Sequence, residues 1–149
     1  MTIAEMRCSQ AAVALIRQPT AVGWNFLCQW SDSWRALHLI GGHREGEETF
    51  RECAMREMLE ELPVGFADVS VAAQPLAHLE YVTFSESAGV PTRYILEVFQ
   101  TSIDSHAREK VTRQPENAWV SREQIQLGLA ADGRRISPTV ELILVKLGL

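Results

Sequence analysis

The stretch GGHREGEETFRECAMREMLEELPVG, residues 41–65, decides how this sequence is interpreted. Its apolar residues recur four positions apart, the spacing of one face of an amphipathic helix: Phe50, Ala54, Met58 and Leu62. Thr49, followed three residues later by Glu52, has the arrangement of a capping box, and Pro63 supplies a stop. The pattern therefore predicts a helix over residues 50–62, entered from a glycine-led loop.

Seven acidic residues crowd into this loop and helix. On a helix, Glu57, Glu60 and Glu61 are three and four residues apart, so they project from neighbouring positions on one side. Like charges at this separation repel one another, whereas a hard divalent cation binds carboxylate oxygens and removes the repulsion. The helix therefore predicts a shared carboxylate site for Mg²⁺ or Mn²⁺.

The order of residues over 42–64 resembles the signature box of the Nudix hydrolase family, G-x5-E-x7-R-E-U-x-E-E-x-G-U, in which U is apolar. A glycine is followed by five residues and Glu48, then by seven residues and the run REMLEEL. One fixed position departs, because Pro63 stands where the family has glycine. Val64 occupies the closing apolar place, and the pair Gly65-Phe66 offers a glycine and an apolar residue two positions late.

This resemblance implies roles for five residues of the box. Glu57, Glu60 and Glu61 match the metal ligands, and Glu48 matches an earlier glutamate that joins the metal shell or braces the loop. Arg56 matches the arginine that pairs with the glutamates and orients them. The implied activity is hydrolysis of a nucleoside diphosphate linked to a group X, such as a nucleoside triphosphate, a dinucleoside polyphosphate or a nucleotide sugar.

Several glutamates are candidates for the base that deprotonates the attacking water. Glu57 in the box is ranked first. Glu109 and Glu116 lie in a polar stretch later in the chain, and Glu97 lies in an apolar strand, where it needs a partner or a metal.

The rest of the chain predicts an α+β fold. Strands are expected over 11–16, 25–30, 36–40, 69–73, 78–85, 93–101 and 118–120. Residues 102–116 are expected to be a loop, a brief helix begins after Ser121, and a helix over 138–147 covers one sheet face. The resemblance implies an α/β/α sandwich, with a mixed β-sheet between helices, formed by residues 1–149 as a single domain.

Composition narrows the classes of partner. The 149 residues carry a net charge of −5, which disfavours nucleic acid and anionic membranes, and a polyanionic substrate needs local positive charge. No apolar run approaches the roughly 20 residues of a membrane span, and residues 1–7 do not read as a secretion signal. We expect a cytoplasmic protein with three reduced cysteines and a small nucleotide as substrate.

Several single residues have two interpretations. Trp24, Trp30, Trp34, His43 and Tyr81 are candidates for substrate contact, although aromatic residues in strands more often pack and loop histidines are more often solvated. Three isolated basic residues are treated as solvated rather than as phosphate contacts: Arg44, Arg93 and Lys110. Arg93 could equally pair with Glu97.

Two further expectations concern the protein as a whole. Pro63 motivates an alternative function, a catalytically inactive Nudix-fold module that senses a nucleotide without cleaving it. The apolar helix over 138–147 motivates a homodimer.

Overall fold

The computed structural model describes residues 2, 5–85 and 87–149. Its strands form one seven-stranded sheet in the order β4-β6-β1-β3-β2-β7, with β5 also paired to β6. The strands are β1 (Arg7–Thr20), β2 (Gly23–Ser31), β3 (Ala36–His43), β4 (Val69–Val71), β5 (Ala77–Ser85), β6 (Val90–Ile103) and β7 (Asn117–Ser121). The sheet is mixed, because β1 and β6 are parallel while the other pairs are antiparallel.

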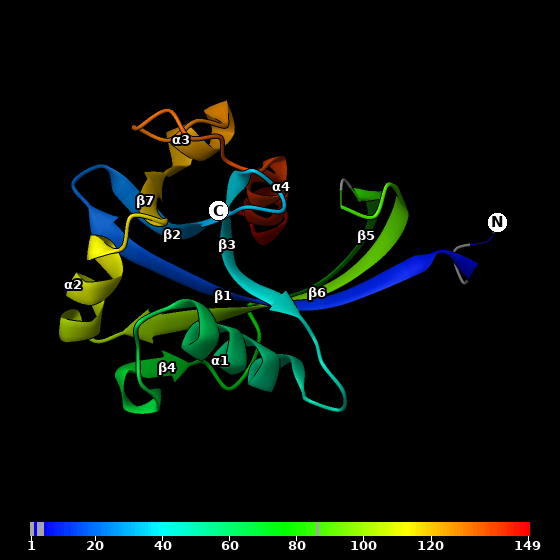
Figure 1. Cartoon of the computed structure of the whole chain (residues 1–149), viewed down its shortest axis with the longest axis horizontal. Coiled ribbons are helices and arrows are strands. Elements are labelled where there is room, and N and C mark those ends of the chain that lie inside the picture. Colours follow the sequence, from blue (N-terminus) through cyan, green and yellow to red (C-terminus); the bar gives the residue numbers. More distant parts are fainter. Residues whose placement is uncertain (1, 3–4, 86) are drawn as a thin grey trace.

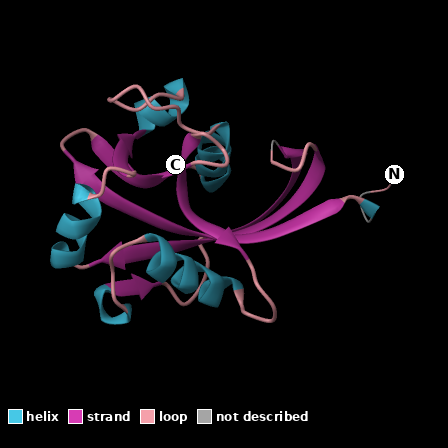
Figure 2. Ribbon diagram, viewed as in Figure 1, coloured by secondary structure: helices cyan, strands magenta, loops and turns pink. Residues whose placement is uncertain are grey.

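Helices cover both faces of this sheet (Figures 1 and 2). They are α1 (Phe50–Glu61), the short 3₁₀ helix η2 (Phe66–Asp68), α2 (Ser105–Arg113), α3 (Arg122–Leu127) and α4 (Pro138–Leu147). In Figure 1, α1 lies on one side of the paired strands β1 and β6, and α3 and α4 lie on the other. The α/β/α sandwich predicted from the sequence is confirmed.

The alternation of side chains along β1 explains the two layers. Val13 and Leu15 belong to the buried cluster that α3 and α4 complete, whereas Ala14 and Ile16 belong to the cluster that α1 and α2 complete. The continuous apolar run of this strand is therefore what a strand buried on both faces requires.

The observed strands β1 and β3 are longer than the apolar runs that predicted them, because backbone pairing continues beyond those runs. The apolar run predicts a strand over 11–16, but β1 continues to pair with β6 at its start and with β2 as far as Thr20. Gly41 and Gly42, expected to begin a loop, are still part of β3 and pair with β1.

The prediction of a loop over 102–116 is wrong. β6 extends to Ile103, and α2 begins directly after Asp104, whose side chain accepts a hydrogen bond from the Ala107 amide at 2.7 Å. Ala107 and Val111 are four residues apart and both are buried. Two apolar contacts and a cap are enough to stabilise so short a helix. Because its other residues are mostly polar, the sequence pattern did not indicate a helix.

The helix of the box ends as its sequence requires. The capping box of Thr49 and Glu52 is formed, and α1 stops at Glu61. Leu62 is extended, with φ −116° and ψ 152°, because the ring of the following proline disfavours the helical region for the residue before it. Val64 packs against the core, but Phe66 is 73% exposed, so Val64 rather than Phe66 takes the closing apolar place.

The last helix, α4, packs its apolar face against the core of its own chain. Ser137 caps α4, Pro138 occupies its first turn, and Val140, Ile143 and Leu144 are buried against the sheet. The apolar face that motivates a homodimer is therefore covered within the chain, and a dimer stays a prediction. No helix of the described residues is long and apolar enough to cross a membrane.

Candidate metal and substrate site

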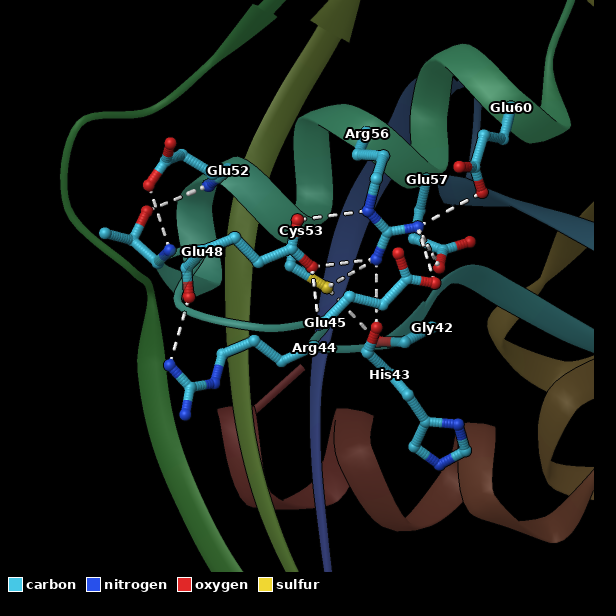
Figure 3. Close-up of polar contacts among 11 residues, drawn as sticks. Gly42, His43, Arg44, Glu45, Glu48, Glu52, Cys53, Arg56, Glu57 and Glu60 are labelled. Atoms are coloured by element: carbon cyan, nitrogen blue, oxygen red, sulfur yellow. Dashed lines mark hydrogen bonds and ion pairs between the residues drawn. The ribbon is translucent and has the colours of Figure 1, made fainter.

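Arg56 lies at the centre of the box and holds its acidic residues in place (Figure 3). Its Nε and Nη2 donate to the two carboxylate oxygens of Glu48 at 3.0 and 2.8 Å. Its Nη1 donates to Glu57 and to Glu60, each at 3.1 Å, and its Nη2 also donates to the His43 carbonyl oxygen at 3.0 Å. One planar guanidinium therefore connects the helix to the loop that precedes it.

Glu48 is held from two directions. Besides its bidentate pair with Arg56, it accepts a hydrogen bond from the Glu45 amide at 2.8 Å. Chiefly the Arg56 hydrogen bond, and then the Glu45 amide, lower the pKa of Glu48 to about 2. Both carboxylate oxygens of Glu48 accept hydrogen bonds from the protein, so this residue stabilises the position of the loop against α1.

Glu57 packs directly against the backbone of Gly42. A Cβ added at Gly42 would lie 2.3 Å from the nearer Glu57 oxygen, so a larger residue there would have to displace the Glu57 carboxylate. The preceding Gly41 has φ +157°, and a Cβ there would lie 2.2 Å from the Ala12 carbonyl oxygen. These two glycines let the end of β3 approach both β1 and the carboxylate of α1.

Glu61 lies at the end of α1, where it is partly buried beside Glu57. Burial, followed by the hydrogen bond and the negative charge of Glu57, raises the pKa of Glu61 well above its ordinary range. The backbone there is tied to the sheet, because Gln29 Nε2 donates to the Glu61 carbonyl oxygen at 3.0 Å and also to Asn117 Oδ1 at 2.9 Å.

The box glutamates do not yet converge as a complete ligand set. No group of three acidic, histidine or cysteine side chains in the described parts of the chain is arranged to hold a metal ion. Glu57 and Glu61 lie together, but Glu60 is turned toward Arg56 and its side chain is 57% exposed. The chemistry of these side chains nevertheless fits a hard divalent cation, which prefers carboxylate oxygens. Glu57 and Glu61 lie side by side, and of the two Glu57 is paired with Arg56.

A cavity of about 370 Å³ opens beside these carboxylates. Glu61 and Gly42 line it at the box, and Trp30 and Trp34 line it elsewhere. Of the tryptophans considered as substrate contacts, these two are therefore near the box. Trp24 does not line it, because it lies on the β1–β2 hairpin beneath the Arg17 guanidinium at 4.7 Å.

Tyr81 also lines the cavity, but its ring is engaged. It stacks on Tyr94 with ring centroids 5.4 Å apart, and the Lys146 ammonium lies 5.7 Å over the ring. Because Tyr94 and Lys146 already lie over this ring, Tyr81 offers less free ring surface on which a base could stack.

Glu97 has a partner, as its place in a largely apolar strand predicts, but this partner is His78 rather than Arg93. The His78 Nδ1 lies 2.9 Å from a Glu97 oxygen, and this contact raises the pKa of His78. Arg93 instead pairs with Glu80 at 2.9 Å. The expected alternative, an ion pair between Arg93 and Glu97, is wrong because the two residues lie on the same strand and Glu80 faces Arg93 from β5.

The other two candidate bases lie elsewhere. Glu109 is on α2 and Glu116 precedes β7, both side chains are exposed, and no described contact joins either to a box glutamate.

Sequence reasoning missed two residues that shape the site. Gln29 anchors the end of α1, and its sequence signal is a polar side chain inside a predicted hairpin strand. His38 lines the cavity in contact with Trp34, and burial lowers its pKa to about 4. His38 is therefore neutral at physiological pH, which no sequence pattern indicates.

Comparison with known proteins places this arrangement in a family. A NUDIX domain model matches residues 6–140. Among curated proteins, no significant match is found.

Solved structures show the same fold at low sequence identity. A MutT protein from Methanosarcina mazei Go1 has a TM-score of 0.61 at 19% identity, covering 97% of this chain and 95% of that one. RenU, a Nudix hydrolase from M. smegmatis, has a TM-score of 0.58 at 18% identity, covering 95% and 88%. The Ap4A hydrolase of C. elegans has a TM-score of 0.57 at 16% identity, covering 78% and 83%.

The domain match covers most of the chain, and it includes the glycine, Arg56 and the glutamates whose contacts are described above. The chain is therefore a member of the Nudix hydrolase family.

Proposed function

We propose that this protein is a Mg²⁺- or Mn²⁺-dependent pyrophosphohydrolase that cleaves a nucleoside diphosphate linked to a group X. The observation that carries the proposal is the pair of carboxylates formed by Glu61, which lines a cavity with aromatic walls, and Glu57 beside it. The class of X includes phosphate chains, a second nucleotide or a sugar. Residues 1–149 are proposed to act as one domain in the cytoplasm.

Glu57, Glu60 and Glu61 would hold the metal ion. A bound divalent cation supplies neutralisation of the phosphate charge and a water molecule of lowered pKa. For Glu60 to contribute, its carboxylate must leave Arg56, and its exposure leaves it free to rotate. Glu48 is proposed to act mainly as the brace that keeps Arg56 in place.

The chain's own residues provide the positioning on which phosphoryl transfer depends. Arg56 aims Glu57, and Gln29 fixes the backbone at Glu61. Trp30 and Trp34 offer apolar surface for the nucleoside. Glu57 is the first candidate for the group that accepts the proton of the attacking water, since Glu97 is engaged by His78.

The proposal is tested by incubating the protein with nucleoside triphosphates, dinucleoside polyphosphates, ADP-ribose, nucleotide sugars and NADH, with Mg²⁺ or Mn²⁺. We expect mass spectrometry to show cleavage of a phosphoanhydride bond in at least one compound, abolished by chelator. Ligand-dependent melting shifts with no product from any compound would instead support the nucleotide-sensing alternative.

A further inference from the structure

Strand β5 leaves one edge unpaired. It pairs with β6 along its whole length, from Ala77 to Ser85, and among the described residues no backbone hydrogen bond joins it to a second strand. Figure 1 shows the β5–β6 hairpin extending away from the helices. We call the unpaired side of β5 the open edge. A strand edge of nine residues can pair with a strand of another chain, so proteins usually cover or protect such edges.

The hydrogen-bond pattern shows which residues face the open edge. The Val98 carbonyl oxygen of β6 accepts a hydrogen bond from the Leu76 amide at 2.7 Å, so Val98 directs its backbone groups toward β5. Alternate residues of a strand bond to the same side, and Val98 and Leu96 lie opposite Ala77 and Leu79. The odd-numbered residues of β5 therefore bond to β6. The even-numbered residues direct their amide and carbonyl groups to the open edge: His78, Glu80, Val82 and Phe84.

The side chains of these outward residues are exposed. Val82 and Phe84 are 47% and 60% exposed, and the side chains of His78 and Glu80 are about half exposed. The strand AHLEYVTFS contains no proline and no lysine, the residues that commonly prevent an edge strand from pairing. The open edge therefore combines apolar surface with one histidine and one glutamate.

These residues become complementary when β5 pairs with β5 of a second copy of the chain. Two copies related by a two-fold axis present the same strand to each other, and the strands then run antiparallel. With Leu79 on the axis, His78 of each copy lies opposite Glu80 of the other, and both residues belong to the outward set. The same register brings the exposed Val82 of one copy beside Leu76 of the other, which is 46% exposed.

Neighbouring registers are less favourable. With Glu80 on the axis, two carboxylates would lie directly opposite each other, which is destabilising. With Tyr81 on the axis, Glu80 would lie opposite Val82, and His78 opposite Phe84, so neither charge would have a partner across the pair. The register centred on Leu79 is therefore the one that charge pairing selects.

The charges around the open edge also suit a second copy of this acidic chain. Copies with a net charge of −5 repel each other unless charges are balanced where they meet. Here Arg93 pairs with Glu80 at 2.9 Å, and the imidazole of His78 lies between Glu97 and Glu80, at 2.9 and 3.2 Å. Basic and acidic groups thus alternate across this surface, and an antiparallel copy presents the same alternation in reverse.

We propose that two copies of this chain associate through their open edges, forming an antiparallel β5–β5 pair centred on Leu79. The two sheets then continue into each other, and this interface is distinct from the apolar face of α4, which is covered within the chain. Tyr81 and Ser85 of β5 line the main cavity, so the interface borders the candidate site.

Sedimentation velocity over a range of protein concentrations tests the interface. We expect a dimer whose Kd rises about 10-fold or more in Val82→Lys, because a lysine on an edge strand opposes pairing. Glu80→Gln removes two symmetry-related charge pairs, so Kd should rise about 5-fold. Both substituted residues direct their backbone groups away from β6, so each variant should keep the wild-type fold by circular dichroism.

Two matched controls lie away from β5. Val145→Lys changes an equally exposed apolar residue on α4, and Asp132→Asn removes an exposed ion pair with Arg134. Each should change Kd by less than about 2-fold, the usual effect of a surface substitution. A wild type that sediments as a monomer at every concentration, or a dimer that Val82→Lys and Val145→Lys weaken equally, overturns the proposal.

Disulfide cross-linking tests the register. In a Cys8→Ser chain, which lacks the exposed thiol, Leu79→Cys should form an intermolecular disulfide on mild oxidation. The two residues on the axis form a non-hydrogen-bonded pair, with Cα atoms about 4.5 Å apart, within the range of a disulfide. Val82→Cys in the same background should remain monomeric in denaturing gels. Cross-linking at Val82→Cys instead, or at neither position in variants that melt like the wild type, overturns the pairing centred on Leu79.

Discussion

The carboxylate of Glu57 rests on Gly42 so closely that a Cβ there would lie 2.3 Å from its Oε1. Gly42 and Glu57 lie fifteen positions apart in the printed sequence, so this contact fixes the strand end against the helix. The first glycine of the box is thus explained by room for a carboxylate rather than by an unusual backbone angle.

Gly42→Ala should therefore reduce activity by displacing Glu57. A displacement of about 1 Å in a catalytic group costs on the order of 100-fold in rate, so we expect a loss of that size in kcat, measured on the best substrate of the panel. Gly65→Ala is the control, since its Cβ would meet only Asp68 Oδ2 at 3.3 Å. Unchanged turnover in Gly42→Ala would show that the position of Glu57 does not matter.

Arg56→Lys tests whether geometry or charge holds the site. Lysine keeps the positive charge but loses the fork that bonds Glu48, Glu57 and Glu60 together. We expect a loss of about 10- to 100-fold in metal affinity or activity, the usual effect of removing a group that orients ligands. Activity equal to wild type would mean that charge alone suffices.

The three glutamates of α1 should not be equivalent. Glu61→Gln should lower kcat by about 100-fold, or about 2.7 kcal/mol, because Glu61 lines the cavity and lies beside Glu57. Glu60→Gln should cost less, since this carboxylate is exposed and paired with Arg56. The metal assignment is wrong if both variants keep wild-type turnover on every nucleotide.

The pH dependence of stability should reveal the crowding at Glu61. Its pKa in the folded, metal-free chain is raised above 4.5, toward about 9, first by burial and then by Glu57. The folded state therefore binds the proton more tightly than the unfolded state, and stability is lost as pH rises through this window. In chelator, melting temperature should fall from pH 5 to pH 9 more in the wild type than in Glu61→Gln.

Mg²⁺ provides the matching control for this pH experiment. The cation should raise the melting temperature of the wild type most at the alkaline end, where Glu61 is ionised. Wild type and Glu61→Gln that respond identically to pH and to Mg²⁺ would contradict a preformed site at Glu61.

Pro63→Gly tests the departure from the family box. Leu62 already has the extended conformation that precedes proline, and Val64 already packs, so glycine adds only freedom to the unfolded chain. We expect a loss of about 0.4–1 kcal/mol in the free energy of unfolding by denaturant, with turnover within about 2-fold of wild type. A large change in turnover would show that the exit turn influences the metal face.

The sequence predicted the helix of the box and its cap because apolar spacing, Thr49, Glu52 and Pro63 all act locally. It also indicated strand β1, because a continuous apolar run is typical of a strand that is buried on both faces of a sheet. It could not indicate α2, which is a mostly polar helix stabilised by two buried residues and one cap.

The site was predictable in identity but not in arrangement. Helical spacing placed the glutamates on one side, but Arg56 draws Glu60 away from Glu61 through contacts that depend on rotamers. Gln29 and Glu61 are 32 positions apart in the printed sequence, and the hydrogen bond between them forms only because β2 lies beside the end of α1. Such long-range pairings leave no local pattern.

The most direct test of the account is hydrolysis in water enriched in ¹⁸O, with Mg²⁺ and the best substrate of the panel. We predict that one product carries a single ¹⁸O atom on one phosphorus of the broken anhydride, and that chelator or Glu61→Gln removes the signal. Incorporation that persists in both, or products with no ¹⁸O on phosphorus, would contradict metal-dependent attack of water at the carboxylates of α1.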